Sequence, residues 1–381
     1  MFVYLISLYM IENLKANNSS SPKFKLENDN ISKNSTCFGT SKLNNCKSKQ
    51  KFGKFETITS KAKRYKKTAL IFLLLAICVI FITNPKIYSA CCLDAISVWA
   101  FKVLPALFPF FIITKIIVEL LTPKQTKLDK LFNKLYHTPA TCSSVYFLSV
   151  LSGYPMGAKL ICNMCERGVY TKEDAKRMLS FCSVSGPMFM VGSVGVAIFN
   201  NYTVGLIILI ANVVASLING LIYRGKKQQL NECGDKEKLI SSSVLADSIN
   251  EALSSILMVG AYMVLAFLSI KILNNLKIIP FLSTGIANIL HIKDAGVIQA
   301  FIAGLFEITH GAISMNACTC SLQLKAILTA GLIGFGGVSI FLQSMYFVKK
   351  LKIKPQFIAL QKLTQGLIAI LVAFPLSLIC L

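Results

Sequence analysis

The sequence predicts an all-α polytopic membrane protein with about seven transmembrane helices, two re-entrant hairpins and an inverted structural repeat. The first observation is composition: 54% of the 381 residues are hydrophobic, and the mean hydropathy is +0.61. Soluble domains contain about 45–50% apolar residues. The second is a series of long apolar segments separated by short basic loops. The third is a set of glycine-rich helix breaks that recurs in the second half of the chain.

The positive charge lies where a membrane protein places it. The formal net charge of +23 would also suit a nucleic-acid-binding protein. Lysines, however, crowd the N-terminal tail and the short loops between apolar segments, as the positive-inside rule expects of cytoplasmic loops. We therefore expect no nucleic-acid partner.

Residues 1–67 are predicted to be a disordered, basic cytoplasmic tail. From residue 12 onward the tail is rich in Asn, Ser and Lys and carries fourteen Lys and Arg. Such a composition cannot bury enough apolar surface to fold. The cluster Lys61–Lys67 directly precedes an apolar segment, so we expect it to contact anionic lipid headgroups.

Residues 68–223 form the predicted first membrane half. Its spans are Thr68–Thr83, Val103–Leu121, Thr171–Phe199 (interrupted at Ser183–Pro187) and Tyr202–Tyr223. Ile87–Phe101 is expected to be an amphipathic helix at the membrane interface, because it mixes apolar residues with Asp94 and Trp99. The basic residues that follow the second span predict a cytoplasmic loop (Lys124, Lys127, Lys130 and Lys134).

A re-entrant hairpin is predicted at Thr141–Glu166, with its tip at Ser152–Lys159. Two glycines and a proline weaken a continuous helix there, through lost rigidity and a missing N–H. In a bilayer, the freed backbone groups need partners inside the protein or in a watery cavity. Basic residues on both sides, including Lys134 and Arg167, place both ends of the hairpin in the cytoplasm.

A cytoplasmic linker, residues 224–245, precedes the predicted second membrane half, residues 246–381. The spans of this half are Leu257–Leu273, Leu324–Val348 and Phe357–Cys380, and its hairpin surrounds Gly304–Gly311. Leu257–Leu273 corresponds to Val103–Leu121, and from these two spans onward the loop charges place three crossings and one hairpin in each repeat. An odd number of crossings makes the two repeats inverted.

The repeat rests on matched breaks. Gly153 and Gly304 are 151 positions apart, and so are Gly186 and Gly337. A chance alignment of apolar segments is the alternative, and two lysines on the predicted outer side count against the repeat (Lys271 and Lys293).

The breaks predict a solute site near the bilayer midplane. Broken helices expose N–H groups and positive helix ends, which suit a carboxylate. The predicted substrate-binding residues are Ser152, Gly153, Tyr154, Pro155, Lys159, Ser183, Ser185, Gly186, Glu307, Thr309, Gly336 and Gly337. Glu307 and His310 are also predicted to carry a proton or coupling ion, because intramembrane ionisable groups are usually functional. In the alternative, Glu307 pairs with Lys159 or His310 to steady the hairpins, and the serines satisfy freed carbonyls.

The sequence motifs give little support for an enzymatic site or a metal site. The chain has no HExxH, GxSxG or phosphate-loop motif, so we expect no enzyme and no cofactor. The thirteen cysteines are scattered, and the pair Cys162 and Cys165 lacks a second pair to complete a metal site. Two alternatives stay open: an intramembrane hydrolase using Ser152 or Ser185 with His310, and a structural membrane partner. A homo-oligomer also stays open.

Four motifs resemble a known family. They are Leu104–Phe111, Ser152–Lys159, Ser185–Phe189 and Phe306–Thr309. Together they resemble the YlbJ-type sporulation integral membrane proteins, which belong with the nucleoside-recognition, or gate-domain, proteins. The similarity covers about residues 68–381, and the long Lys- and Asn-rich tail departs from the family pattern.

The resemblance implies an endospore-forming bacterium and movement of dipicolinic acid across the outer forespore membrane. The predicted function is therefore a secondary transporter for a small organic anion in the bacterial cell membrane. A nucleoside-like solute is the alternative within the same family group.

Overall fold

The computed structural model describes residues 68–69, 71–72, 74–120, 127–139, 141–225, 244–292 and 294–381. Throughout these ranges the regular structure is helical, and they contain no strand. The predicted tail, residues 1–67, and nearly all of the predicted linker lie outside them. The all-α class is confirmed for the part of the chain that the structure describes.

Five helices in the described ranges are long and apolar enough to cross a membrane. They are Pro85–Ile117, Tyr202–Ile222, Leu245–Asn275, Leu322–Leu351 and Pro355–Cys380, and each overlaps one predicted span. Five further apolar helices have 10–17 residues. Two of these, Leu74–Thr83 and Met188–Ile198, lie within the remaining two predicted spans. The chain is therefore a polytopic membrane protein.

The chain divides into two compact units, residues 1–85 and residues 86–381. Of the first, the structure describes the helix Leu74–Thr83 and a few residues around it. The second contains every element discussed below.

The predicted interfacial helix and the span after it form one continuous helix. Helix α3 (Pro85–Val98) runs through the π-helical turn η1 (Trp99–Val103) into α4 (Leu104–Leu120). The Trp99 indole N–H donates to the Ile256 carbonyl at 3.1 Å, and Gly260 leaves space for the ring. This contact with a distant helix holds η1, which spans the expected boundary between Phe101 and Val103.

The predicted cytoplasmic loop contains a helix. Helix α5 (Lys127–Tyr136) begins directly after residues 121–126, which the structure does not describe. It buries Phe132 and Tyr136 on one face. Tyr136 stacks on Phe181 with ring centroids 4.8 Å apart. The sequence analysis read this segment by its lysines and overlooked the apolar residues spaced three to four positions apart, which are typical of an amphipathic helix.

The remaining helices follow in two groups, one in each predicted membrane half. After α5 the chain forms α6 (Cys142–Ser152), α7 (Met156–Glu166), α8 (Lys172–Met178), the π-helix η2 (Met188–Ile198) and α9 (Tyr202–Ile222). The second half forms α10 (Val244–Asn275), α11 (Ile278–Leu290), α12 (Ala295–Phe306), α13 (Ile308–Ala317), α14 (Leu322–Phe335), α15 (Gly337–Val348), the short η3 (Lys349–Leu351) and α16 (Pro355–Cys380). A junction between helices lies within each predicted break, namely Ser152–Lys159, Ser183–Pro187, Gly304–Gly311 and the break at Gly336 and Gly337.

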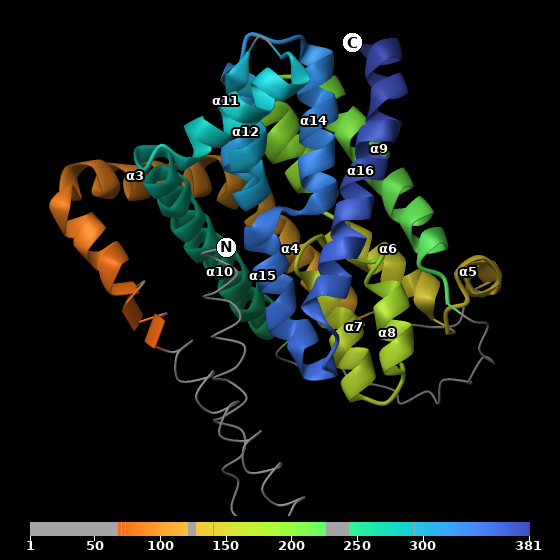
Figure 1. Ribbon diagram of the computed structural model, residues 1–381. Coiled ribbons are helices and arrows are strands. Elements are labelled where there is room, and N and C mark those ends of the chain that lie inside the picture. Colours follow the sequence, from red (N-terminus) through yellow and green to blue (C-terminus); the bar gives the residue numbers. More distant parts are fainter. Residues whose placement is uncertain are drawn as a thin grey trace, which may run out of the picture. The chain divides into compact units, whose positions relative to one another are not determined.

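Helices α9, α14 and α16 pack against one another, and Figure 1 shows α14 and α16 side by side. Two buried asparagines on α9 join the halves by hydrogen bonds. Asn212 donates to the Ala330 carbonyl at 3.2 Å, and Asn219 donates to the Gln361 carbonyl at 3.0 Å. The amides thus fix the contact between apolar helices, where polar groups need partners.

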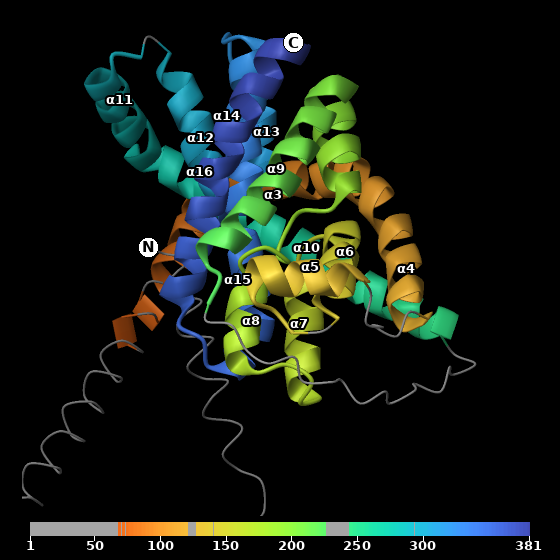
Figure 2. The same ribbon diagram turned by 90° about the vertical axis from the view of Figure 1, so that its right-hand side faces the viewer.

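Each predicted hairpin is a helix–break–helix pair whose arms pack together. Helices α6 and α7 form the first pair, and α12 and α13 form the second. Figures 1 and 2 both show α12 near one end of the second unit and α7 near the other.

Backbone segments of different breaks approach each other closely. Gly153 has a φ of 69°, and a Cβ placed on it would lie 2.4 Å from the Gly186 nitrogen. In the second half, Gly337 has a φ of 65°, and its Cβ would lie 3.4 Å from the Gly304 oxygen. These are the two glycine pairs that the 151-residue offset relates. Side chains are excluded from the first contact by both conformation and space.

Replacing Gly153 by Ala should destabilise the fold more than an equal change at Gly168. Gly168 also has a positive φ, 75°, but its Cβ would meet nothing within 4 Å. An alanine there costs about 1–2 kcal/mol through backbone conformation alone. At Gly153, overpacking against Gly186 adds about 1–3 kcal/mol.

The measurement is thermal unfolding of the two purified variants in the same detergent. The midpoint of Gly153→Ala should lie several degrees below that of Gly168→Ala. Equal midpoints would show that the backbone contact between the first two breaks is not tight.

Candidate functional site

Residues of both hairpins line one cavity, although they lie about half the chain apart. Its polar wall consists of Ser152, Gly153, Tyr154, Ser185, Gly186, Glu307, Thr309, Ser339 and Gln343. Its apolar wall consists of Val103, Leu107, Phe110, Phe111, Phe189, Val259, Met263 and Ile340. The free volume is about 50 Å³, which holds a few water molecules.

Seven of the twelve predicted substrate-binding residues thus lie around the cavity. They are Ser152, Gly153, Tyr154, Ser185, Gly186, Glu307 and Thr309. Ser152 uses its hydroxyl proton in a 2.6 Å bond to the Leu148 carbonyl, as the structural alternative for the serines expected. The sequence did not single out Ser339 and Gln343, although two polar residues four apart in an apolar helix were a usable signal.

Four helices begin at the breaks around this cavity: α7, η2, α13 and α15. Helix N-termini carry partial positive charge and unpaired N–H groups. Helix α13 is capped by the Glu307 carboxylate, which accepts from the His310 N–H at 2.6 Å. Helices α7, η2 and α15 have no side-chain cap. Three of the four N-termini therefore lack a side-chain cap of the kind that Glu307 supplies to α13.

Glu307 is buried, with 4% of its surface exposed, and its backbone is extended with a φ of −147°. Its carboxylate faces the backbone of α13, whereas the Lys159 ammonium lies 2.7 Å from Glu251. The structure therefore does not show the alternative pairing of Glu307 with Lys159.

Lys159 lies outside the residues that line the cavity. It shares the Glu251 carboxylate with Lys115, and both ammonium groups contact the same oxygen atom. A role for Lys159 in binding solute stays a prediction that this geometry does not favour. Lys115 lies within the predicted span Val103–Leu121. A lysine inside a span usually pairs with another group, so this residue was an available signal for a buried ion pair.

His310 lies three residues after Glu307 but lines a different cavity. Its ring is 4.6 Å from the Phe267 ring, and its Nδ1 atom is 3.3 Å from the Ser314 hydroxyl. The second cavity also contains Asp294, Gln299 and Thr319. The histidine needed by the hydrolase alternative is thus not among the residues that line the cavity of Ser152 and Ser185.

Three of the other predicted residues lie beside Tyr154: Pro155, Gly336 and Ser183. Pro155 is buried, joins Tyr154 through a cis peptide bond and occupies the N-cap position of α7 without a side-chain hydrogen bond. A Cβ on Gly336, which has a φ of 89°, would lie 3.6 Å from the Tyr154 hydroxyl. Ser183 lines a smaller cavity of about 10 Å³ on the other side of Tyr154.

The sequence analysis missed Lys362. This lysine lies on α16, 5% exposed, and donates to the Tyr154 hydroxyl and to Gln365 Oε1, both at 2.8 Å. It also donates to the Ser183 carbonyl. A lysine inside the predicted span Phe357–Cys380 was the available signal.

No group of three or more His, Cys, Asp or Glu side chains in the described ranges could hold a metal ion. The cysteines of the CxxC motif, Cys162 and Cys165, are free thiols. Cys165 donates to the Thr171 carbonyl at 3.7 Å.

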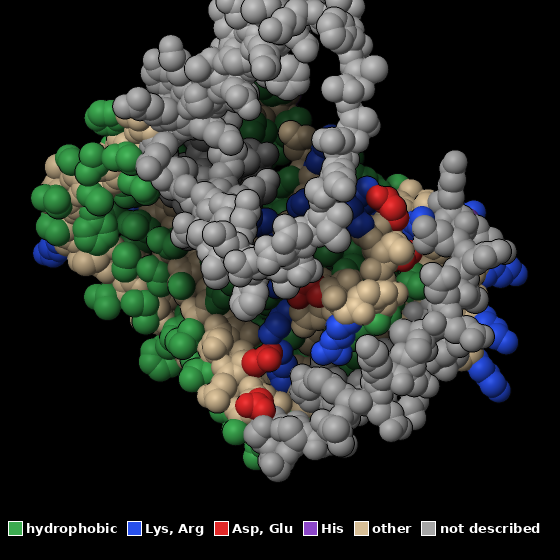
Figure 3. Space-filling model, turned by 90° about the horizontal axis from the view of Figure 1, so that it is seen from below, with side chains coloured by type: hydrophobic (Ala, Val, Ile, Leu, Met, Phe, Trp, Pro, Cys, Tyr) green, Lys and Arg blue, Asp and Glu red, His purple; other side chains and the backbone are tan. Residues whose placement is uncertain are grey.

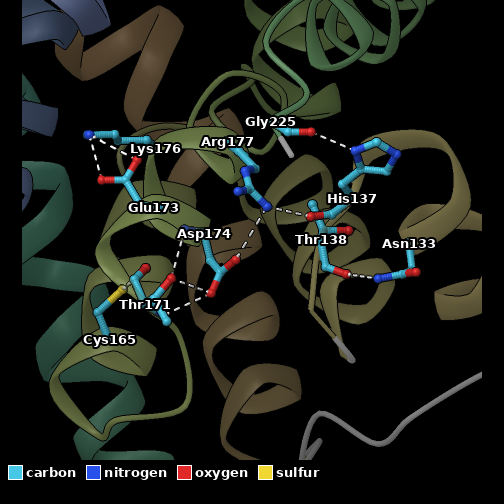
Figure 4. A network of polar contacts seen from close by, with 10 residues as sticks. All are labelled: Asn133, His137, Thr138, Cys165, Thr171, Glu173, Asp174, Lys176, Arg177 and Gly225. Carbon is cyan, nitrogen blue, oxygen red and sulfur yellow. Dashed lines mark hydrogen bonds and ion pairs between the residues drawn. The ribbon is translucent and has the colours of Figure 1, made fainter. Parts of the chain in front are cut away.

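A polar network ties three connections together at the end of the second unit that holds α7 and α8 (Figure 4). Arg177 donates to the His137 carbonyl at 2.7 Å and lies 3.8 Å from Asp174. His137 Nδ1 lies 2.6 Å from the Gly225 oxygen. Asp174 also forms a capping box with Thr171.

Lysine and arginine side chains gather on this end of the molecule (Figure 3). A basic hollow there is lined by Lys172, Glu173, Lys176, Arg177, Tyr223, Gly225, Lys352, Ile353, Lys354 and Phe357. This charge supports the prediction that this end faces the cytoplasm.

No family model matches the chain, and no solved structure matches it. The chain is 26% identical over 317 residues to the sporulation integral membrane protein YlbJ of Bacillus subtilis (strain 168). The alignment covers 76% of this chain and 77% of that protein. The similarity confirms the resemblance that the four motifs predicted. It supports the assignment of this integral membrane protein to the YlbJ-type sporulation integral membrane proteins.

Proposed function

We propose that the chain is a secondary transporter for a small organic anion, bound where the four helix breaks meet. The observation that carries this proposal is the group of three uncapped helix N-termini around one cavity. Broken helices whose positive ends point at an anionic solute are a feature of many transporters. The family resemblance implies dipicolinic acid as that anion.

The chain itself shows how a carboxylate is held at such a break. Glu307 caps α13 with its own carboxylate, in a buried setting. A solute carboxylate at α7, η2 or α15 would make the same kind of contact with backbone N–H groups. A dicarboxylate such as dipicolinate can occupy two helix ends at once.

The structure corresponds to a closed state. A cavity of about 50 Å³ admits a few waters but no aromatic dicarboxylate. Binding therefore requires a movement of the breaks. In transporters built from repeats, one repeat rocks or opens against the other around a fixed site.

An inverted repeat would supply that movement. The helix order after the first hairpin matches in the two halves, and the glycine contacts obey the 151-residue offset. The two hairpins lie toward opposite ends of the second unit (Figure 2). Each hairpin could then open toward its own side of the membrane.

A nucleoside-like solute is the second candidate. The lining residues named above include one carboxylate, Glu307, and no lysine or arginine. Thr309 and Gln343 add neutral hydrogen-bonding groups, and Phe110 and Phe189 add aromatic surface. This set would also suit a neutral ring compound with several polar groups.

The basic tail is proposed to bind anionic lipid headgroups. It lies outside the described residues, so the proposal rests on the cluster Lys61–Lys67 alone.

Proteoliposomes that contain the purified chain should take up labelled dipicolinate and not labelled uridine. The physical reason is that three helix N-termini around the cavity lack a side-chain cap, and helix N-termini stabilise carboxylates. Uptake should saturate and should be inhibited by unlabelled dipicolinate.

Uridine uptake without dipicolinate uptake would favour the second candidate. Binding of either solute without uptake would favour a structural or receptor role. Hydrolysis of an added ester would revive the hydrolase alternative.

Glu307→Gln should lower dipicolinate uptake by about tenfold or more. A hydrogen bond to a charged group is worth about 1.5–3 kcal/mol, and 1.4 kcal/mol corresponds to a factor of ten. The matched control is Glu173→Gln, because Glu173 is exposed and pairs with Lys176. The control should keep uptake within about twofold. Normal uptake by a folded Glu307→Gln variant would remove Glu307 from the site.

The inverted repeat predicts opposite accessibility for two cysteines. In single-cysteine variants, an impermeant maleimide should label Cys318 from the outer side of the membrane and Cys233 from the cytoplasmic side. Labelling of both from the same side would refute the proposed topology.

A further inference from the structure

The Lys362 ammonium is buried among oxygen atoms instead of facing an acid. Its partners are the Tyr154 hydroxyl, Gln365 Oε1 and the Ser183 carbonyl. The ammonium also lies 4.8 Å from the centroid of the Tyr154 ring. In the described ranges, no carboxylate forms an ion pair with it. Oxygen atoms and an aromatic face therefore replace the water that would solvate the charge.

This position is unusual for a structural lysine. A charged group at membrane depth is costly and commonly belongs to an ion or proton pathway. Lys362 lies seven residues after the first residue of α16, which is about 10 Å along the helix axis. An ammonium that is buried without a carboxylate partner holds its proton less firmly than one in water, because burial disfavours the charged form.

The partners of Lys362 connect it to the proposed solute site. Tyr154 lines both the central cavity and the smaller cavity that contains Lys362. Ser183 belongs to the second break, and Ser185 and Gly186, two and three residues later, line the central cavity. Any separation of these two breaks therefore changes the solvation of the ammonium.

Two titratable groups face Lys362: the Tyr154 hydroxyl and the buried Cys182 thiol. The neighbours from the other elements packed around it are not titratable. They are Leu179, Phe335, Ile340, Phe341, Ser344, Val348 and Ile358. Protonation changes at this place thus belong mainly to Lys362 itself.

We propose that Lys362 Nζ is a proton-binding site that couples solute transport to proton movement. The inference rests on the transport function proposed above. Between the closed breaks, the amine of Lys362 is shielded from water, and this shielding disfavours its charged form. When the breaks separate, water reaches Nζ and the amine takes up a proton. When the breaks close again, the ammonium gives this proton back to water, so one proton is taken up and released in each cycle.

The test uses proteoliposomes that contain the full chain, labelled dipicolinate and an imposed pH gradient. In the unmodified protein, the gradient should change the initial uptake rate at least fivefold relative to equal pH. Lys362→Gln should lose this response while exchange of internal for external dipicolinate remains measurable. Lys354→Gln is the matched control, because Lys354 is exposed and precedes the same helix. It should behave as the unmodified protein.

A gradient response that persists in Lys362→Gln would overturn the proposal, whereas the transport function would stand. Loss of exchange in both Lys362→Gln and Lys362→Met, with normal elution on gel filtration, would also overturn it. In that case the lysine would bind solute instead of coupling it to protons.

A second measurement needs no solute and stays informative if dipicolinate is not transported. Deuterium uptake is followed for peptides covering residues 152–159 and 183–187 at pD 6 and pD 9, corrected for intrinsic exchange. Protection in the unmodified protein should be at least tenfold higher at pD 9, where the neutral amine favours the closed breaks, than at pD 6. Protection in Lys362→Gln should be the same at both values. Protection independent of pD in the unmodified protein would overturn the proton site, whatever the transport result.

Discussion

The close approach of backbone to backbone at the helix breaks is the constraint on which the rest of the structure depends. In the hydrocarbon region, a broken helix needs partners for its freed N–H and C=O groups. Gly153 lies against Gly186, and Gly337 lies against Gly304, because no side chain separates these segments. The contact brings four helix N-termini into one region and leaves a small cavity between them. The site is thus a consequence of how the breaks are satisfied.

The same constraint explains how the buried charges are arranged. Two of these charges supply a hydrogen-bond partner that a helix break would otherwise lack. The Glu307 carboxylate satisfies N–H groups at the start of α13, and the Lys362 ammonium satisfies the Ser183 carbonyl at the second break. Lys115 and Lys159 instead share Glu251 between helices. In the proposed transporter, the capping charges are the ones that can exchange their partners for a solute or a proton, whereas the carboxylate of Glu251 already has two ammonium partners.

The sequence predicted helices and breaks well, because both are local properties. Hydropathy locates apolar helices, and Gly with Pro locates their ends. The sequence analysis was incomplete where a contact with a residue far away in the chain determines the structure. The pairing of Lys159 with Glu251 and the continuity through Trp99 both depend on α10, which lies far away in the chain. Lys362 was hidden because a lysine near the end of a span resembles a loop charge. Its burial arises only when the second break packs on α16.

Tyr154 explains how the proposed solute site and the proposed proton site can share one part of this fold. Its ring and hydroxyl form a wall between the central cavity and the cavity of Lys362. The hydroxyl accepts the lysine's hydrogen bond, and the backbone on either side forms the first break. A solute that displaces this residue must also disturb the ammonium, because the two share one side chain. Coupling by this route needs no long pathway through the protein, only a two-state element that both sites bias.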